Sequence, residues 1–381
     1  MQEVAKHYLD KKISSFYTDY IQPRKNKRHL VLGEQPGPSD IILSSNDYLC
    51  LSNHPEIVEA QMAVLTGKKR ELLMSAIFLD SHSPQQRLQN KLADFLRFEA
   101  AIICQSGWAA NVGLLQTIAG KDMPVYIDHF AHASLWDGII FAKAHPVMFR
   151  HNHMESLKKK IQKYGSGIIL VDSVYSTIGT VAQLRRIAEL AQEYECILVV
   201  DESHSLGTHG YQGRGLVHEW GLSDKVDFIT ASLAKTFAGR AGLIACSEKF
   251  ARYFPYSSHP AIFSSALLHS EIAALDATLN VIKKAHTRRK KLFNNAQYLR
   301  DELIRNGHSI ASQSQIIALE TGSEEKTEEV RDILESRGVF GAVFCRPATG
   351  KNHAIIRMTL HSDLTEMHLN KIVTTIPSLC I

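Results

Sequence analysis

The chain has 381 residues, 45% of them hydrophobic, which is enough for a large core and for more than one compact domain. Its net charge of +4 is mild, and the basic clusters at 158–160 and 288–291 lie in polar, helix-like stretches. Solvated helix faces are favoured there over phosphate binding, and nothing indicates nucleic-acid binding. The N-terminus is polar and no apolar run is long enough to cross a bilayer, so we expect a cytoplasmic protein.

Cysteine and histidine spacing argues against disulfides and metal. The six cysteines are scattered, which is typical of free thiols in a reducing compartment. Nineteen histidines allow pairs such as His151 with His153 or His129 with His132. No carboxylate or cysteine spacing completes a site around either pair, so we expect no metal.

The N-terminal region begins with apolar side chains at helical spacing between residues 4 and 21, which predicts an amphipathic helix. A basic connector at 24–28 follows, and both a phosphate contact and a solvated linker remain open for it. A short strand at 41–43 then precedes a turn that contains Asn46. The Asn46 amide can donate to a ligand carboxylate or carbonyl, or simply stabilise its own turn.

The next unit is a helix at 88–95, a strand at 101–104, and a turn into another helix at Ser106, Gly107 and Trp108. Backbone amides at such a helix start bind anions, and a glycine lets the chain approach the ligand closely. We therefore assign a cofactor phosphate to this turn. Without these neighbours, Trp108 would be interpreted as a core residue.

Further strands are predicted at 125–128, 167–171 and 197–200. Their aliphatic runs are typical of buried parallel strands, so Asp201 should lie at a carboxyl end, where open α/β sheets bind ligands. A carboxylate there can pair with the pyridinium nitrogen of pyridoxal phosphate. The alternative is that Asp201 only caps the following helix.

Lys235 lies among small and hydroxylated residues, between the predicted strand 226–230 and the apolar run 243–246. A lysine withdrawn from water loses charge stabilisation, so its amine becomes available to form a Schiff base with a carbonyl. An ordinary surface lysine is the alternative.

The C-terminal part is helical from 271 to about 306 and then alternates strand, helix and strands, as in a small α+β domain. Arg357, on the strand predicted at 354–360, is our candidate for binding a substrate carboxylate, because a guanidinium grips a carboxylate through two parallel bonds. The alternative is an exposed strand arginine.

Several separate motifs together resemble the α-oxoamine synthases, pyridoxal-phosphate enzymes of the aspartate-aminotransferase fold that condense an amino acid with an acyl-CoA and release carbon dioxide. The motifs are Ser45-Asn46-Asp47-Tyr48-Leu49, Ser106 to Asn111, Asp128 to Ser134, Asp172 to Ser176, Asp201 to His204, Ser232 to Lys235, and Ile356 to Leu360. Within the family the chain is most similar to synthases of α-hydroxyketone quorum-sensing autoinducers, through segments such as Met74-Ser75-Ala76 and 231–237.

The resemblance implies a mainly parallel sheet covered by helices, as in the large domain of aminotransferases. It implies an N-terminal arm at 1–45, a large cofactor-binding domain at 46–285 and a small C-terminal α+β domain at 286–381. It also implies a homodimer with shared active sites, in which the arm packs on the partner subunit and Ser264 and Ser265 reach the partner's cofactor phosphate.

The same resemblance implies roles for individual side chains. His132 would stack on the pyridine ring and protonate the thioester carbonyl oxygen; Ser176 and His204 would lie at the cofactor's phenolic oxygen; Ser232 would add a hydroxyl to the phosphate. Asn46 and Arg357 would bind the amino substrate, and Lys235, with Asp201, would carry the chemistry.

Two departures from the family pattern bear on specificity. Where the family has a glycine-rich, arginine-containing loop, this chain has the larger, more apolar residues 72–79, which should reshape the amino-acid pocket. After the lysine, Ala238 and Ala241 replace the usual glycines and Arg240 is unusual.

Three functional hypotheses follow. The first is an autoinducer synthase that joins a medium- or long-chain acyl-CoA to S-adenosylmethionine or 2-aminobutyrate. The second is a housekeeping synthase for biotin, haem or sphingoid bases that uses alanine, glycine or serine. The third is a non-catalytic binding or regulatory protein of the same fold, against which the set Asp201, His204 and Lys235 argues.

Overall fold

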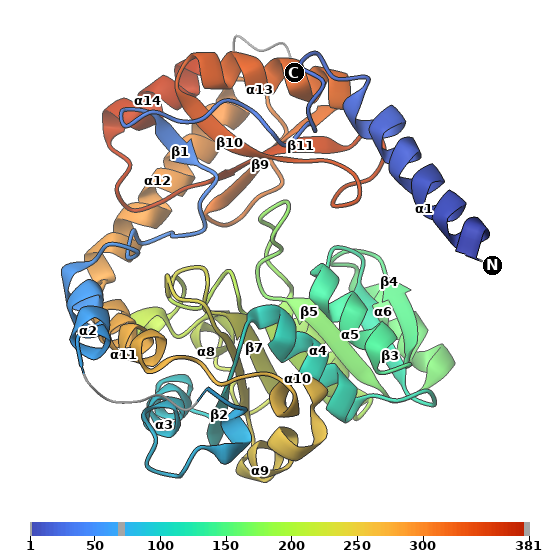
Figure 1. Cartoon of the computed structure of the whole chain (residues 1–381), viewed down its shortest axis with the longest axis vertical. Helices are drawn as coiled ribbons and strands as arrows, with labels where there is room; N and C mark the ends of the chain where they lie inside the picture. The colour runs from blue at the N-terminus through green and yellow to red at the C-terminus, as the bar shows by residue number, and fades with distance from the viewer. Residues whose placement is uncertain (1, 68–72, 377–381) are drawn as a thin grey trace. The chain divides into compact units, whose positions relative to one another are not determined.

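The computed structural model describes residues 2–67 and 73–376 (Figure 1). Its contacts divide the chain into a large unit, Asn46–Phe293 with His361–Asp363, and a small unit, which holds the described residues of Met1–Ser45, Asn294–Leu360 and Leu364–Ile381. Leu72, in the segment expected to reshape the amino-acid pocket, lies outside the described residues, as does Cys380.

The large unit is built on a 7-stranded sheet with strand order β2-β8-β7-β6-β5-β3-β4. The strands are β2 (Ala100–Cys104), β3 (Pro124–Asp128), β4 (His145–Phe149), β5 (Ile168–Asp172), β6 (Ile197–Asp201), β7 (Phe228–Ser232) and β8 (Gly242–Cys246). Within this sheet only β8 runs antiparallel to its neighbours, β2 and β7. The mainly parallel sheet predicted from the aliphatic runs is confirmed.

Helices cover this sheet, which explains why its central strands are apolar on both faces. Helix α4 (Gly107–Ile118) packs on α5 (Ala133–Phe141) and on strands β7 and β8. Helix α6 (Met154–Tyr164) packs on α7 (Leu184–Glu193) and on strands β3 and β4. Every residue of β5 is buried. The other helices of this unit are α2 (Pro55–Leu65), α3 (Pro84–Leu96), α8 (Leu216–Glu219), α9 (Glu248–Ser257), α10 (His259–Ile262) and α11 (His269–Lys284).

The small unit contains a 4-stranded sheet in the order β1-β10-β11-β9. Its strands are β1 (Ile41–Leu43), β9 (Ile316–Gly322), β10 (Val339–Phe344) and β11 (Ala354–Thr359), with helices α13 (Glu324–Ser336) and α14 (Glu366–Thr375). The helix α12 (His286–Arg305) is divided between the two units. Strand β1 pairs parallel with β10, so the N-terminal segment adds one strand to a sheet made otherwise by the C-terminal part.

The N-terminal helix covers the predicted range but changes its hydrogen-bond pattern near its end. It is α-helical over α1 (Gln2–Phe16) and continues as the π-helical turn η1 (Tyr17–Ile21). Its apolar side chains, including Val4, Tyr8 and Ile13, are exposed. The helix therefore buries no apolar face among the described residues.

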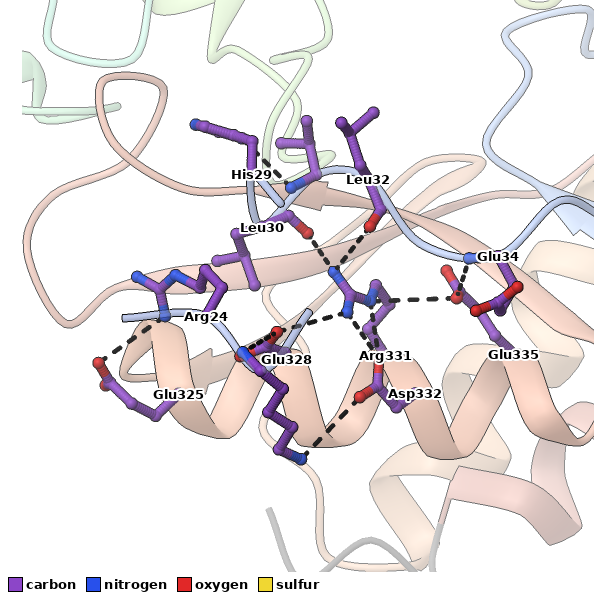
Figure 2. Close-up of polar contacts among 12 residues, drawn as sticks. Arg24, His29, Leu30, Leu32, Glu34, Glu325, Glu328, Arg331, Asp332 and Glu335 are labelled. Atoms are coloured by element: carbon purple, nitrogen blue, oxygen red, sulfur yellow. Dashed lines mark hydrogen bonds and ion pairs between the residues drawn. The ribbon is translucent and has the colours of Figure 1, made fainter. Parts of the chain in front are cut away.

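The segment 24–34 is held on α13 by a cluster of charges (Figure 2). Arg331, which is buried, donates through Nη1 to the carbonyl oxygen of Leu30 and through Nη2 to Asp332 Oδ1 at 2.6 Å. At the two ends of the segment, Arg24 pairs with Glu324, and the backbone N–H of Glu34 donates to Glu335 Oε2 at 2.8 Å. These contacts fix residues 24–34 to the small unit.

Replacing Arg331 with methionine should destabilise the protein by about 3 kcal/mol, because it leaves buried carboxylates and backbone carbonyls without their cation. The Glu328 and Glu335 carboxylates lie 3.9 and 4.0 Å from the guanidinium, and their side chains are only 6% and 7% exposed. Urea unfolding measures this loss, with Arg305→Ala, a largely exposed residue of α12, as a control expected to change stability by less than about 0.5 kcal/mol. Equal, small effects of the two variants would contradict this role of Arg331.

Candidate active site

Acidic and hydroxyl side chains gather at one edge of the large sheet. Four neighbouring strands, β7, β6, β5 and β3, end on Ser232, Asp201, Asp172 and Asp128 respectively. Asp172 and Asp201 are direct register partners. Because these strands are parallel, their carboxyl ends open on the same edge, which is where α/β sheets of this kind bind ligands.

Asp201 is held by two donors rather than by a helix. Its Oδ1 accepts the backbone N–H of Ser203 at 2.8 Å, and its Oδ2 accepts Asn111 Nδ2 at 2.8 Å. The residues after β6 form turns, so Asp201 does not cap a following helix. A buried carboxylate held in this way is suited to pairing with a cationic ring nitrogen.

His132 begins α5, where its backbone N–H donates to Asp172 Oδ2 at 3.0 Å. Its ring lies edge-on to Trp108, with the ring centroids 5.9 Å apart. Burial lowers the pKa of His132, the charge of Asp201 opposes this, and the charge of Lys235 adds to it. His132, Asp201 and Lys235 therefore share one electrostatic environment.

Asp172 is the second buried carboxyl group beside His132. Burial and, secondarily, the neighbouring Asp201 raise the pKa of Asp172 well above its usual range, against the His132 N–H bond. The protonated form of Asp172 is thus favoured.

Lys235 lies half-buried on the loop between β7 and β8. The loop is closed by backbone hydrogen bonds from Leu233 N to Ala241 O at 2.9 Å and from Ala238 N to Lys235 O at 2.9 Å. Ala238 has φ of 49°, in the left-handed region that glycine adopts without strain. This explains why a glycine suits position 238.

Ala238→Gly should raise the free energy of unfolding by about 0.5 kcal/mol, because relief of the left-handed strain exceeds the extra chain entropy of glycine. Urea unfolding of the cofactor-free protein measures this difference directly. As a control, Ala251→Gly in α9 should destabilise by about 0.5–1 kcal/mol. A loss of stability in Ala238→Gly would contradict the strain argument.

The start of α4 forms a close cradle with the end of β7. Ser106 caps the helix by accepting the backbone N–H of Ala109 at 3.0 Å. A Cβ added to Gly107 would lie 2.6 Å from Ser232 Cβ and 2.8 Å from its Cα, so only glycine allows this approach. The first amides of a helix have no intrahelical acceptor, and here they lie beside the Ser232 side chain. This arrangement fits a bound phosphate group.

His204 is buried and bonded to a residue that sequence reasoning did not assign. Tyr48 Oη lies 2.6 Å from His204 Nδ1 and 3.2 Å from Asn46 Oδ1. The pairing joins positions 156 residues apart, so no local pattern indicates it. Tyr48 holds the His204 ring, and both Asn46 and His204 belong to one hydrogen-bonded chain.

The remaining candidates occupy other places. Ser176 is half-buried in the loop after β5, where Val174 and Val181 form an isolated antiparallel bridge. Ser264 and Ser265 follow α10. The Ser265 carbonyl oxygen accepts a hydrogen bond of 3.0 Å from Nε2 of Gln105, the residue that precedes Ser106. Arg357 lies on β11 in the small unit; at 3% exposure it is not an exposed strand arginine.

No group of three or more His, Cys, Asp or Glu able to hold a metal ion occurs within residues 2–67 and 73–376. In the same residues, the structure contains no helix with the length and hydropathy of a membrane span.

The sequence matches the family of class I and II aminotransferases over residues 38–376. The chain belongs to this family. Its members depend on pyridoxal phosphate, and the cradle at Gly107, the buried Asp201 and the nearby Lys235 fit that cofactor.

Individual proteins similar to this chain indicate which type of enzyme within the family it resembles. The chain is 50% identical to CAI-1 autoinducer synthase from Vibrio campbellii, over 96% of this chain and 93% of that protein. It is 32% identical to 8-amino-7-oxononanoate synthase 1 from Bacillus velezensis, over 91% and 89% of the two chains. Serine palmitoyltransferase from Sphingomonas wittichii shares the fold, with a TM-score of 0.84 at 24% identity over 89% and 87%. The predicted resemblance is confirmed, and the chain is a pyridoxal-phosphate-dependent enzyme of the α-oxoamine synthase type.

Proposed function

We propose that this enzyme condenses a medium- or long-chain acyl-CoA with S-adenosylmethionine or 2-aminobutyrate. The products are coenzyme A, carbon dioxide and an α-aminoketone, which is a precursor of an α-hydroxyketone autoinducer. The observation that carries the proposal is the 50% identity with CAI-1 autoinducer synthase over nearly the whole chain. The arrangement of Lys235, Asp201 and His132 in one electrostatic environment supports it.

Pyridoxal phosphate, when bound, supplies a ring that accepts electron density from the Cα atom of the amino donor. The Lys235 amine binds the cofactor and removes the Cα proton. The Asp201 carboxylate pairs with the ring nitrogen and keeps it protonated. Ser106, Gly107, Trp108 and Ser232 hold the phosphate, in keeping with the cradle at the start of α4.

Other residues orient the substrates in this proposal. His132 covers one face of the ring and donates to the thioester carbonyl oxygen, while Ser176 and His204 bind the phenolic oxygen. Asn46 and Arg357 bind the donor. The bond from Cα to the acyl carbon would release the coenzyme A thiolate, which takes up a proton. Loss of the donor's carboxyl group as carbon dioxide would then leave Cα to take back a proton from the Lys235 ammonium group.

The alternative is a housekeeping synthase that uses alanine, glycine or serine, and the 32% identity with an 8-amino-7-oxononanoate synthase favours it. The two functions differ in the donor pocket. The segment 72–79 differs from the family pattern, and its described residues Leu73, Met74 and Phe78 are exposed and apolar.

Thiol release from a panel of acyl-CoAs, each paired with one of the five donors, separates the two functions when product masses are read in the same reaction. The proposal expects release with medium or long chains and S-adenosylmethionine or 2-aminobutyrate. Release only with alanine, glycine or serine would establish the alternative. No release with any pair, from protein that binds pyridoxal phosphate, would overturn both.

Arg357→Ala should raise KM for the amino donor by roughly 30-fold with a smaller change in kcat, because the substrate loses a charge-assisted hydrogen-bond pair. Arg357→Lys keeps the charge but not the two parallel bonds, so an intermediate KM is expected. Steady-state thiol release measures both values. An unchanged KM in Arg357→Ala would remove the carboxylate role.

We also propose a homodimer with shared active sites. Its support is the apolar surface that the described chain leaves uncovered: Phe263 is 79% exposed beside Ser264 and Ser265, and the apolar side chains of α1 are exposed along the helix. Ser264 and Ser265 would then approach the partner's cofactor phosphate. A solution mass of twice 42.6 kDa by light scattering would support the dimer, and a monomer that retains full activity would refute it.

A further inference from the structure

Two polar side chains connect Asp201 to His132. Asn111, on α4, donates from Nδ2 to Asp201 Oδ2 at 2.8 Å and to Ser134 Oγ at 2.8 Å. Ser134, on α5, lies 2.8 Å from His132 Nδ1 through its hydroxyl oxygen. Asn111, Ser134 and Asp201 are all buried, so water does not compete for these bonds.

The orientation of the Asn111 amide follows from its neighbours. An ionised carboxylate only accepts hydrogen bonds, so the Asn111 nitrogen, and not its oxygen, must face Asp201. The Asn111 Oδ1 atom has no hydrogen-bond partner within the described residues. A buried acceptor without a partner costs free energy. We infer that the two hydrogen bonds donated by Asn111 Nδ2 contribute more than this cost.

The proton on His132 can be located in the same way. Ser134 Oγ accepts from Asn111 Nδ2, and its own hydroxyl hydrogen remains for His132 Nδ1. The backbone N–H of Ser134 also points to His132 Nδ1, at 3.3 Å, and an N–H can only donate. Nδ1 is therefore the acceptor, and a neutral His132 carries its proton on Nε2.

We propose that Asn111 and Ser134 are positioning residues: Asn111 orients the Asp201 carboxylate, and Ser134 holds His132 in the tautomer whose Nε2–H is a donor. The inference rests on the proposed function for its catalytic consequence, because only that function places Asp201 at the ring nitrogen and His132 on the ring face. The tautomer itself is a property of the protein alone.

This arrangement sets what His132 can do. A donor at Nε2 can stabilise charge that develops on a carbonyl oxygen, whereas the other tautomer would present a lone pair to it. The three bonds also tie α4 and α5 to the end of β6. The Asp201 carboxylate and the His132 imidazole therefore keep one position relative to each other.

The test is the tautomer of His132 in cofactor-free protein labelled with 15N-histidine, read from two-bond 1H–15N correlations. His132→Gln identifies the His132 signal by its loss. Wild type should show one neutral tautomer, protonated at Nε2. Ser134→Ala should show a mixture of tautomers, and Ser134→Thr, which restores the hydroxyl, should return the wild-type pattern.

Ser173→Ala is the matched control. The Ser173 hydroxyl is also buried and bonds the backbone oxygen of Asp201 and the Ser205 hydroxyl, but it does not contact His132 in any hydrogen bond of the described chain. Its removal should leave the His132 signal unchanged. In the loaded enzyme, Ser134→Ala should lower kcat roughly tenfold at similar KM.

Three outcomes would overturn the proposal. They are a wild-type His132 protonated at Nδ1, a Ser134→Ala signal identical to wild type, and an equal change in Ser173→Ala. An inactive wild-type enzyme with the expected tautomer pattern would instead refute the proposed function and leave this inference standing. Should Ser134→Ala fail to fold, the wild-type spectrum and Asn111→Leu, which should disturb the same signal, decide the matter.

Discussion

Lys235→Ala should lose turnover by a factor on the order of 10⁴, because both the covalent attachment of the cofactor and the base for the Cα proton are removed. The structure places Lys235 on the loop after β7, close enough for its charge to lower the pKa of His132. Borohydride reduction followed by peptide mass spectrometry measures attachment independently of turnover. Wild type should carry the cofactor mass on the peptide that contains Lys235, and the variant should carry none.

Lys249→Ala is the control for this experiment. Lys249 is exposed on α9 and does not lie at the end of a strand of the large sheet, where the candidate site residues lie. The variant should keep wild-type turnover and the cofactor mass at Lys235. Retention of activity in Lys235→Ala, or attachment at another lysine, would refute the assignment.

Asp201→Asn should lower kcat by about 100-fold or more, because the charge that holds the ring nitrogen protonated is lost while the shape is kept. An asparagine at position 201 can still accept the Ser203 N–H, and Asn111 can turn its Oδ1, which has no partner among the described residues, towards the new amide nitrogen, so the variant should still fold. Thiol release gives kcat, and the visible absorbance of the bound cofactor reports the change in its electronic state. An unaltered kcat would exclude pairing with the ring nitrogen.

Asp172→Asn is the matched comparison, since Asp172 is the register partner of Asp201 and equally buried. The raised pKa of Asp172 favours its neutral form, and asparagine supplies the same acceptor to the His132 N–H. We expect kcat within about fivefold of wild type, the scale of one neutral hydrogen bond. If Asp172→Asn is as damaging as Asp201→Asn, the assignment of the ring-nitrogen role to Asp201 alone would be refuted.

The pH dependence of stability tests the same distinction. The pKa of Asp172 is higher in the folded protein than in the unfolded chain. The contribution of Asp172 to the free energy of unfolding is therefore fully present at pH below about 4. That contribution is lost as pH rises towards the folded-state pKa. Wild type should therefore lose stability relative to Asp172→Asn as the pH is raised above about 4.

Except for β4, which the sequence analysis does not predict, the strands of the large unit and the residue types at their ends were predictable from the sequence. Parallel strands covered on both faces require continuous aliphatic runs, and such runs ending in Asp128, Asp172 and Asp201 are visible without a structure. Local composition likewise indicates the helix start at Gly107 and the unusual lysine at 235. Helix type was less predictable, because the helix expected between residues 4 and 21 becomes π-helical after Phe16, and end geometry depends on a few weak bonds.

Other features were decided only by the tertiary structure. The pairing of Tyr48 with His204 and of Asn111 with Asp201 joins positions 156 and 90 residues apart, and hydrophobic periodicity carries no information on such pairs. The placement of β1 beside β10 is equally non-local. Sequence alone therefore determined which chemical groups the strand ends present, because burial dictates composition along a strand. Tertiary structure decided which groups touch, because close packing of distant segments fixes hydrogen-bond partners, and through them charge and tautomer.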